Sequence, residues 1–113
     1  MRWYLILVFG ALSHSGYTQV DNVLTSKFTV TQNGTNLTIP YGASHPIDIS
    51  DADLKYLVFS IHGVNRNAND YYDRMITAKN RAGEDGDSTL IIAPQFLTES
   101  DIDAFSLPSE YLY

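Results

Sequence analysis

The chain has 113 residues, a length at which a single globular domain is usual. Hydrophobic residues make up 44% and charged residues 18%, a balance that favours a folded chain over a disordered one. The formal charge is −6 and the seven basic residues are scattered, which argues against a nucleic-acid partner, because neutralising phosphates needs clustered Lys and Arg. The absence of cysteine excludes disulfides, cysteine-ligated metal sites and a thiol nucleophile.

Residues 1–19 have the pattern of an export signal. Arg2 is the only charge before Asp21, and residues 3–12 form an almost unbroken apolar run. A run of about ten apolar residues suits a signal peptide and is too short to span a bilayer, which needs roughly 20. The sequence therefore predicts a signal peptide at 1–19, a secreted or periplasmic domain at 20–113 and no membrane span. The alternative is a buried N-terminal helix or strand.

The first part of the predicted domain has the signature of a β-hairpin. Polar and apolar residues alternate on both sides of Asn33-Gly34, a dipeptide typical of tight hairpin turns. The alternation predicts one buried face, made of Phe28, Val30, Leu37 and Ile39.

The pattern then changes to that of an α/β unit. Residues 50–53 suggest a short helical turn, and the runs at 56–61 and 89–93 are almost continuously apolar, as in central parallel strands covered on both faces by helices. Between the runs, Asn67 or Asn69 can cap a helix, and an acidic loop follows at 84–87. One face of this helix is expected to carry Tyr72, Met75, Ile76 and the stem of Lys79. The sequence thus predicts an α/β fold in which an antiparallel hairpin leads into a parallel βαβ unit.

Two loops should meet at one edge of this sheet. Ligands bind outside the carboxyl ends of parallel strands, where the chain places His62-Gly63-Val64 and Pro94-Gln95-Phe96. In serine hydrolases a backbone N–H in the loop after the third strand stabilises the oxyanion, and each such donor is worth about 3–4 kcal/mol. Val64 is placed to supply this N–H, with His62 bracing the loop. Alternatively, His62 simply ends a strand and Gly63 permits a turn.

The wider sequence resembles a known group of enzymes. The segments VFSIHGVNRNANDYYDRM and TLIIAPQF are similar to the N-terminal part of secreted α/β-hydrolases related to polyhydroxyalkanoate depolymerases and feruloyl esterases. The resemblance implies a serine esterase that acts on a small-molecule or polymeric ester without a cofactor or a metal. It also implies an oxyanion-hole loop at His62, Gly63 and Val64, and substrate contacts from Asn65, Gln95 and Phe96.

One essential motif of that group is missing. The chain contains no Gly-x-Ser-x-Gly, and the nearest string, at residues 42–45, lacks the second glycine. We therefore expect an incomplete α/β-hydrolase, inactive as these 113 residues, in which the polar stretch 98–103 begins an active-site loop. The alternative is a secreted, non-catalytic binding module, such as one for carbohydrate, that presents Tyr71, Tyr72, Tyr111 and Tyr113.

Overall fold

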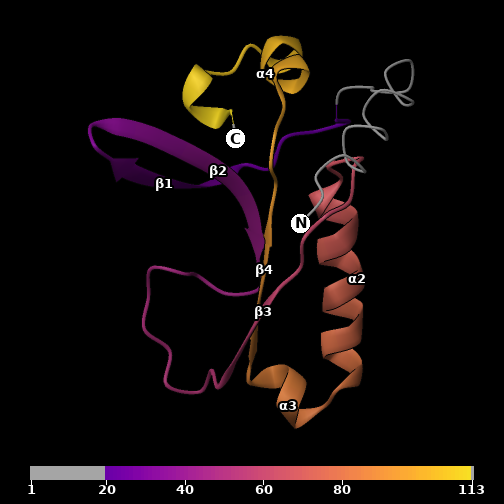
Figure 1. Ribbon diagram of the computed structural model, residues 1–113. Coiled ribbons are helices and arrows are strands. Elements are labelled where there is room, and N and C mark those ends of the chain that lie inside the picture. Colours follow the sequence, from indigo (N-terminus) through magenta and orange to yellow (C-terminus); the bar gives the residue numbers. More distant parts are fainter. Residues whose placement is uncertain (1–19, 113) are drawn as a thin grey trace, which may run out of the picture.

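The computed structural model describes residues 20–112, so the predicted signal peptide lies outside the described residues (Figure 1). A four-stranded mixed sheet in the order β1-β2-β4-β3 forms the centre of the fold. Its strands are β1 (Ser26–Gln32), β2 (Thr35–Ala43), β3 (Tyr56–Phe59) and β4 (Thr89–Pro94). The helices are α2 (Ala68–Arg81), α3 (Glu84–Asp87), α4 (Glu99–Phe105) and the 3-10 helix η1 (Ser109–Tyr111). The predicted α/β class is confirmed at this level.

The β1–β2 hairpin forms as predicted, with Asn33 and Gly34 both at positive φ in the turn. Its register pairs Phe28 with Ile39 and Val30 with Leu37, so these residues do share a face. The prediction that this face is buried is wrong for β1, where Phe28 is 50% and Val30 42% exposed. The reason is that β1 is the outermost strand and η1 packs on the opposite face of the hairpin, where it contacts Thr38 of β2 and Lys27 of β1.

The segment from β3 through α2 to β4 is the predicted parallel crossover. β3 and β4 pair in parallel from Tyr56 with Thr89 to Phe59 with Ile92, and α2 packs on one side of the sheet against β4 and β2 (Figure 1). β4 is the central strand, because β2 joins its other edge in antiparallel orientation. The expectation of helices on both faces is wrong for β3, an edge strand whose Leu57 and Phe59 side chains are more than half exposed.

Helix α2 follows its sequence signals closely. It begins after Asn67, and its predicted inner positions Tyr72, Met75, Ile76 and Lys79 are all partly buried. The Tyr72 ring lies against Gly42 of β2, where an added Cβ would be 3.2 Å from the ring, and its hydroxyl donates to the Ala43 carbonyl over 3.2 Å. A glycine at this point of β2 therefore lets the helix pack closely on the sheet.

Two segments differ from their prediction and a third agrees with it. Residues 84–87 are the short helix α3 rather than a solvated loop, because the Asp87 and Ser88 N–H groups bond to the Gly83 and Glu84 carbonyls. The stretch from 98 is helix α4 rather than an open loop. The short turn expected at 50–53 does form: the Leu54 N–H donates to the Asp51 carbonyl over 3.4 Å, and the Asp51 carboxylate accepts from the Asp53 N–H. In each case local hydrogen bonds of Asp, Thr or backbone groups decide the conformation.

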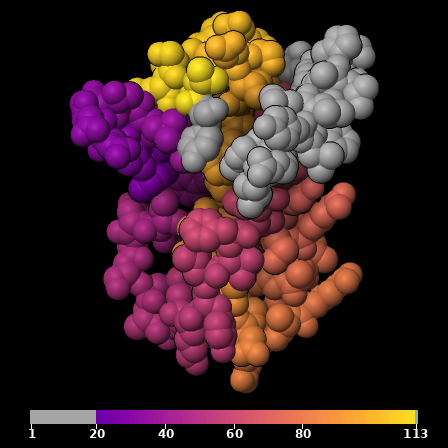
Figure 2. Space-filling view, in the orientation of Figure 1, coloured from indigo at the N-terminus to yellow at the C-terminus, as the bar shows by residue number. Residues whose placement is uncertain are grey.

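The C-terminal elements form a second, small core with the start of the domain. Val20, Leu97 and Tyr111 are buried together there, and Val23, Ile102 and Leu107 pack around them. The hairpin lies beside this region at one end of the molecule (Figure 2), and Thr38 of β2 donates to Glu110 over 3.0 Å. Within residues 20–112 no helix has the length and apolarity needed to cross a membrane.

Candidate functional site

The His62-Gly63-Val64 segment follows β3 directly and turns at the edge of the sheet. Pairing with β4 continues one residue past the strand, where the Ser60 N–H donates to the Ile92 carbonyl over 2.8 Å. A turn from Gly63 to Arg66 then closes through the Arg66 N–H and the Gly63 carbonyl, 3.0 Å apart. The turn leads into α2, so the loop lies between the third strand and the helix that follows it.

His62 ties this loop to the loop after β4. Its Nε2 accepts a hydrogen bond from the Phe96 N–H over 2.8 Å, which leaves Nδ1 as the protonated nitrogen, and that N–H donates to the Gly63 carbonyl, also over 2.8 Å. The His62 and Phe96 rings lie 5.6 Å apart. Both nitrogens are thus engaged in holding backbone, and neither is open to take a proton from a nucleophile.

Val64 is an exposed residue whose backbone N–H is not engaged by the described part of the chain. Its side chain is 65% exposed, and its N–H has no hydrogen-bond acceptor within residues 20–112. The neighbouring Asn65 is exposed as well and lines a polar cavity. These are the properties that an anion-binding backbone donor requires: a fixed loop and an N–H that no protein group uses.

Gln95 and Phe96 have different environments although they are adjacent. Gln95 is only 1% exposed, and its side-chain amide is fully engaged: Oε1 accepts from the Leu24 N–H, and Nε2 donates to the Asn22 and Arg66 carbonyls. Phe96 is partly exposed and lines an apolar hollow. Gln95 therefore holds three backbone segments together, while Phe96 forms part of an accessible surface beside His62.

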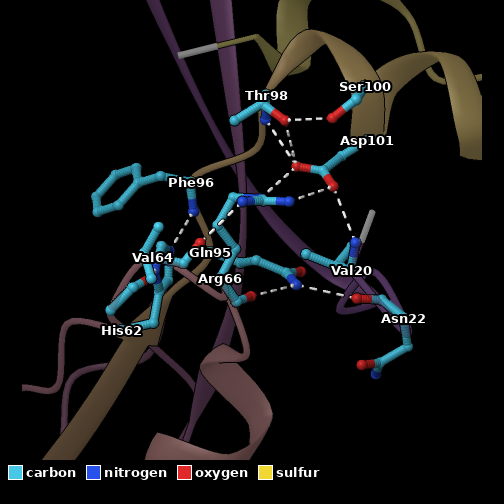
Figure 3. A network of polar contacts seen from close by, with 11 residues as sticks. Val20, Asn22, His62, Val64, Arg66, Gln95, Phe96, Thr98, Ser100 and Asp101 are labelled. Atoms are coloured by element: carbon cyan, nitrogen blue, oxygen red, sulfur yellow. Dashed lines mark hydrogen bonds and ion pairs between the residues drawn. The ribbon is translucent and has the colours of Figure 1, made fainter. Parts of the chain in front are cut away.

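Sequence reasoning missed the most buried polar contact of the site, the ion pair between Arg66 and Asp101. The guanidinium binds the carboxylate in two-pronged fashion, with Nε 2.6 Å from Oδ2 and Nη2 3.1 Å from Oδ1 (Figure 3). Both side chains are buried, and Asp101 has no exposed surface. Only the Thr98-x-x-Asp101 spacing, a capping-box pattern, was readable from the sequence.

Asp101 also receives hydrogen bonds from two other segments. The N–H and hydroxyl of Thr98 donate to Oδ2 and cap helix α4, and the Val20 N–H donates to Oδ1 over 2.9 Å. Burial by itself raises the pKa of Asp101, but the hydrogen bonds from Arg66, Thr98 and Val20 outweigh it and lower the pKa to about 2. The carboxylate is therefore ionised at neutral pH and fixed from three directions.

Two hollows of opposite character adjoin the loops. One is polar, has a volume of about 340 Å³ and lies beside the N-terminus of α2. The other is apolar, has a volume of about 400 Å³ and is lined in part by Phe96 and the exposed Phe59 and Ile61. It lies on the face of the sheet away from α2, because its lining residues Ile92 and Pro94 alternate along β4 with Ala93, the partner of the Gly42 that Tyr72 of α2 contacts. The polar hollow is lined by Val20, Asp21, Asn22, Asn65, Asn67, Asn69 and Asp70. Asn65, the neighbour of Val64, thus lines the polar hollow, and Phe96, which is hydrogen-bonded to His62, lines the apolar one.

The tyrosines considered for carbohydrate binding do not form a common exposed surface. Tyr71 and Tyr72 are partly buried on α2, and Tyr111 is buried in the C-terminal core. Tyr113 lies outside the described residues.

Within residues 20–112 no three His, Cys, Asp or Glu side chains come together as a metal site. Comparisons with protein-family models, curated proteins and solved structures found no match to the chain.

Proposed function

We propose that this chain supplies the oxyanion-hole segment of a serine hydrolase that cleaves carboxylic esters, with the nucleophile and the base lying outside these 113 residues. The observation that carries the proposal is the unengaged N–H of Val64 in a braced loop directly after the third strand. In α/β-hydrolases one oxyanion donor comes from the loop between the third strand and the next helix. Here that loop contains His62-Gly63-Val64 and precedes α2.

The strand arrangement supports the same proposal. An antiparallel hairpin opens the domain, β3 and β4 are parallel, and the loops after both strands meet through His62 and Phe96. His62 acts as a brace in this proposal, since its two nitrogens hold backbone groups. Val64 is the binding donor, and the half-exposed Phe96 offers an apolar contact for the acyl group.

The proposal is tested on the product of the complete reading frame that contains these residues. Replacing Val64 by proline removes the N–H, and position 64 is the second residue of the Gly63–Arg66 turn, where proline is favoured. We expect Val64→Pro to lower kcat for p-nitrophenyl butyrate about 10²- to 10³-fold with little change in KM, because the oxyanion exists only in the transition state. Val64→Ala keeps the donor and should retain activity within about threefold.

Two outcomes would count against the proposal. The first is a reading frame that encodes no Gly-x-Ser-x-Gly downstream of residue 113. The second is equal activity of the Pro and Ala variants, which would show that the Val64 N–H does not bind the reacting oxygen. The 113-residue chain alone should not turn over the ester.

The polar hollow favours a second candidate function, a non-catalytic module that binds neutral sugars. Amide groups both donate to and accept from hydroxyl groups, and the carboxylates of Asp21 and Asp70 would repel anions. Titration of the ¹⁵N-labelled chain with xylobiose tests this candidate. Shifts confined to Asn65, Asn67 and Asn69, and abolished in Asn65→Ala but not in Asn36→Ala on the distant hairpin, would support it.

A further inference from the structure

The orientation of the Val64 N–H is fixed by the peptide group to which it belongs. That group also contains the Gly63 carbonyl, and in a trans peptide the N–H and the C=O point in opposite directions. The Gly63 carbonyl accepts two hydrogen bonds, from His62 Nδ1 over 2.8 Å and from the Arg66 N–H over 3.0 Å. Because both donors hold this oxygen within the loop, the Val64 N–H must point away from it.

Arg66 holds this turn in a conformation that the backbone does not favour. Its φ is +54°, in the left-handed region, which costs roughly 1–2 kcal/mol for a residue with a side chain. Every backbone polar group of Arg66 is engaged, the N–H by Gly63 and the carbonyl by Gln95 Nε2 over 3.1 Å. The conformation is therefore maintained by contacts around it.

The side chain of Arg66 supplies the strongest of these contacts. It folds back over its own loop, so that Nη1 donates to the Val64 carbonyl over 2.8 Å while Nε and Nη2 bind Asp101 (Figure 3). Asp101 is in turn fixed by the N-terminus of α4 and by Val20. The guanidinium thus connects the Val64 carbonyl to Asp101, a buried carboxylate in the segment that follows β4.

We propose that Arg66 is a positioning residue, which, through its ion pair with Asp101, sets the direction of the Val64 N–H. The catalytic role of Arg66 rests on the proposed function. The direction of the Val64 N–H, in contrast, is a property of this chain that does not depend on any activity. Arg66 touches no substrate in this scheme. It acts by holding the carbonyls on both sides of Val64, those of Gly63 and of Val64 itself.

Residual dipolar couplings of the ¹⁵N-labelled chain test the proposal, because they report the direction of each N–H bond. Arg66→Met removes the guanidinium and keeps much of the side-chain volume. Arg66→Lys keeps the charge but loses the fork that reaches Asp101 and the Val64 carbonyl together. Arg74→Met is the matched control, since Arg74 is exposed on α2.

We expect the couplings of Val64 and Asn65 to change by more than the experimental error in both Arg66 variants, while those of β4 and α2 stay as in the parent chain. The control should leave every coupling unchanged. If Arg66→Met does not fold, Arg66→Lys decides the matter, because its positive charge can still compensate Asp101. Unchanged Val64 couplings in a folded Arg66 variant would overturn the proposal, whatever the esterase assay shows.

Failure of the two proposals can be told apart. If the couplings change but the complete protein has no esterase activity, Arg66 positions the loop and the proposed function is wrong. In an active complete protein, Arg66→Lys should lower kcat about tenfold and leave KM within about twofold of the parent value. This loss of kcat is smaller than the one expected for Val64→Pro, which removes the donor itself.

Discussion

At the scale of single residues, Asp101 concentrates more interactions than any other carboxylate described. It pairs with Arg66, caps α4 through Thr98 and accepts from Val20. The attraction within a buried ion pair adds little to the free energy of unfolding, because removing the two charges from water costs a similar amount. Losing only one of the two partners has a much larger effect. Removing one partner leaves an uncompensated buried charge, which destabilises proteins by about 3–5 kcal/mol.

The low pKa of Asp101 predicts an acid-dependent loss of stability. Its ordinary value is 3.8, and hydrogen bonds that outweigh the effect of burial lower the pKa to about 2 in the folded protein. A carboxyl group with a lower pKa in the folded state stabilises that state above about pH 4. This contribution, roughly 2 kcal/mol, is lost as the pH falls toward 2. Urea unfolding between about pH 6 and pH 2 measures it.

Two variants separate this contribution from that of the other carboxyl groups. Asp101→Asn cannot ionise at this position, so its stability should fall less steeply between about pH 4 and pH 2. Asp103→Asn removes an exposed carboxyl group of the same helix and should keep the slope of the parent chain. Equal slopes for the parent and Asp101→Asn would show that Asp101 is not the group responsible.

At the scale of elements, short-range signals predicted most of the fold. Asn33-Gly34 identified the hairpin, and the apolar runs on both sides of the α2 segment identified the parallel crossover. The helices α3 and α4 were not predicted, because Asp, Gly and Ser are poor helix formers and their own capping contacts stabilise these short turns. The Arg66–Asp101 pair was not predictable, since 35 residues separate its partners and only the folded topology brings them together.

Gly86 shows how the α2–α3 junction depends on one small residue. A Cβ at this position would be 1.9 Å from the Lys79 carbonyl oxygen at the end of α2, so a backbone segment would have to move. We expect Gly86→Ala to lower the free energy of unfolding by about 1–3 kcal/mol, as overpacking does, measured by urea denaturation. Asp85→Ala, an exposed neighbour, should stay within about 0.5 kcal/mol of the parent chain. A tolerated alanine at 86 would contradict this packing.

At the scale of the whole molecule, the sheet has a covered and an uncovered face. Helix α2 packs on one side, while Phe28, Phe59 and Ile61 remain about half exposed around the apolar hollow on the other. Apolar patches of this kind bind partner surfaces or cause association, and β3 adds an edge with unpaired backbone groups. The isolated chain should therefore be prone to aggregation.

The uncovered face should bind the dye ANS. Phe59→Glu places a charge in the middle of the patch, so we expect it to reduce ANS fluorescence by about half or more and to slow aggregation, measured by light scattering. Asn80→Glu adds the same charge on the exposed side of α2 and should leave both signals as they are in the parent chain. Equal dye binding by all three chains would contradict the exposure of this face.

The position of Asp101 after all four strands in the sequence has a consequence for the order of folding. Its partners Arg66 and Val20 precede it by 35 and 81 residues, so on a ribosome both are synthesised well before their anchor. The hairpin and the β3–β4 pairing can form from residues already made, whereas the Gly63–Arg66 turn gains its buried counter-charge only when residue 101 emerges. The loop that contains the Val64 N–H is thus completed after the four strands of the sheet that carries it.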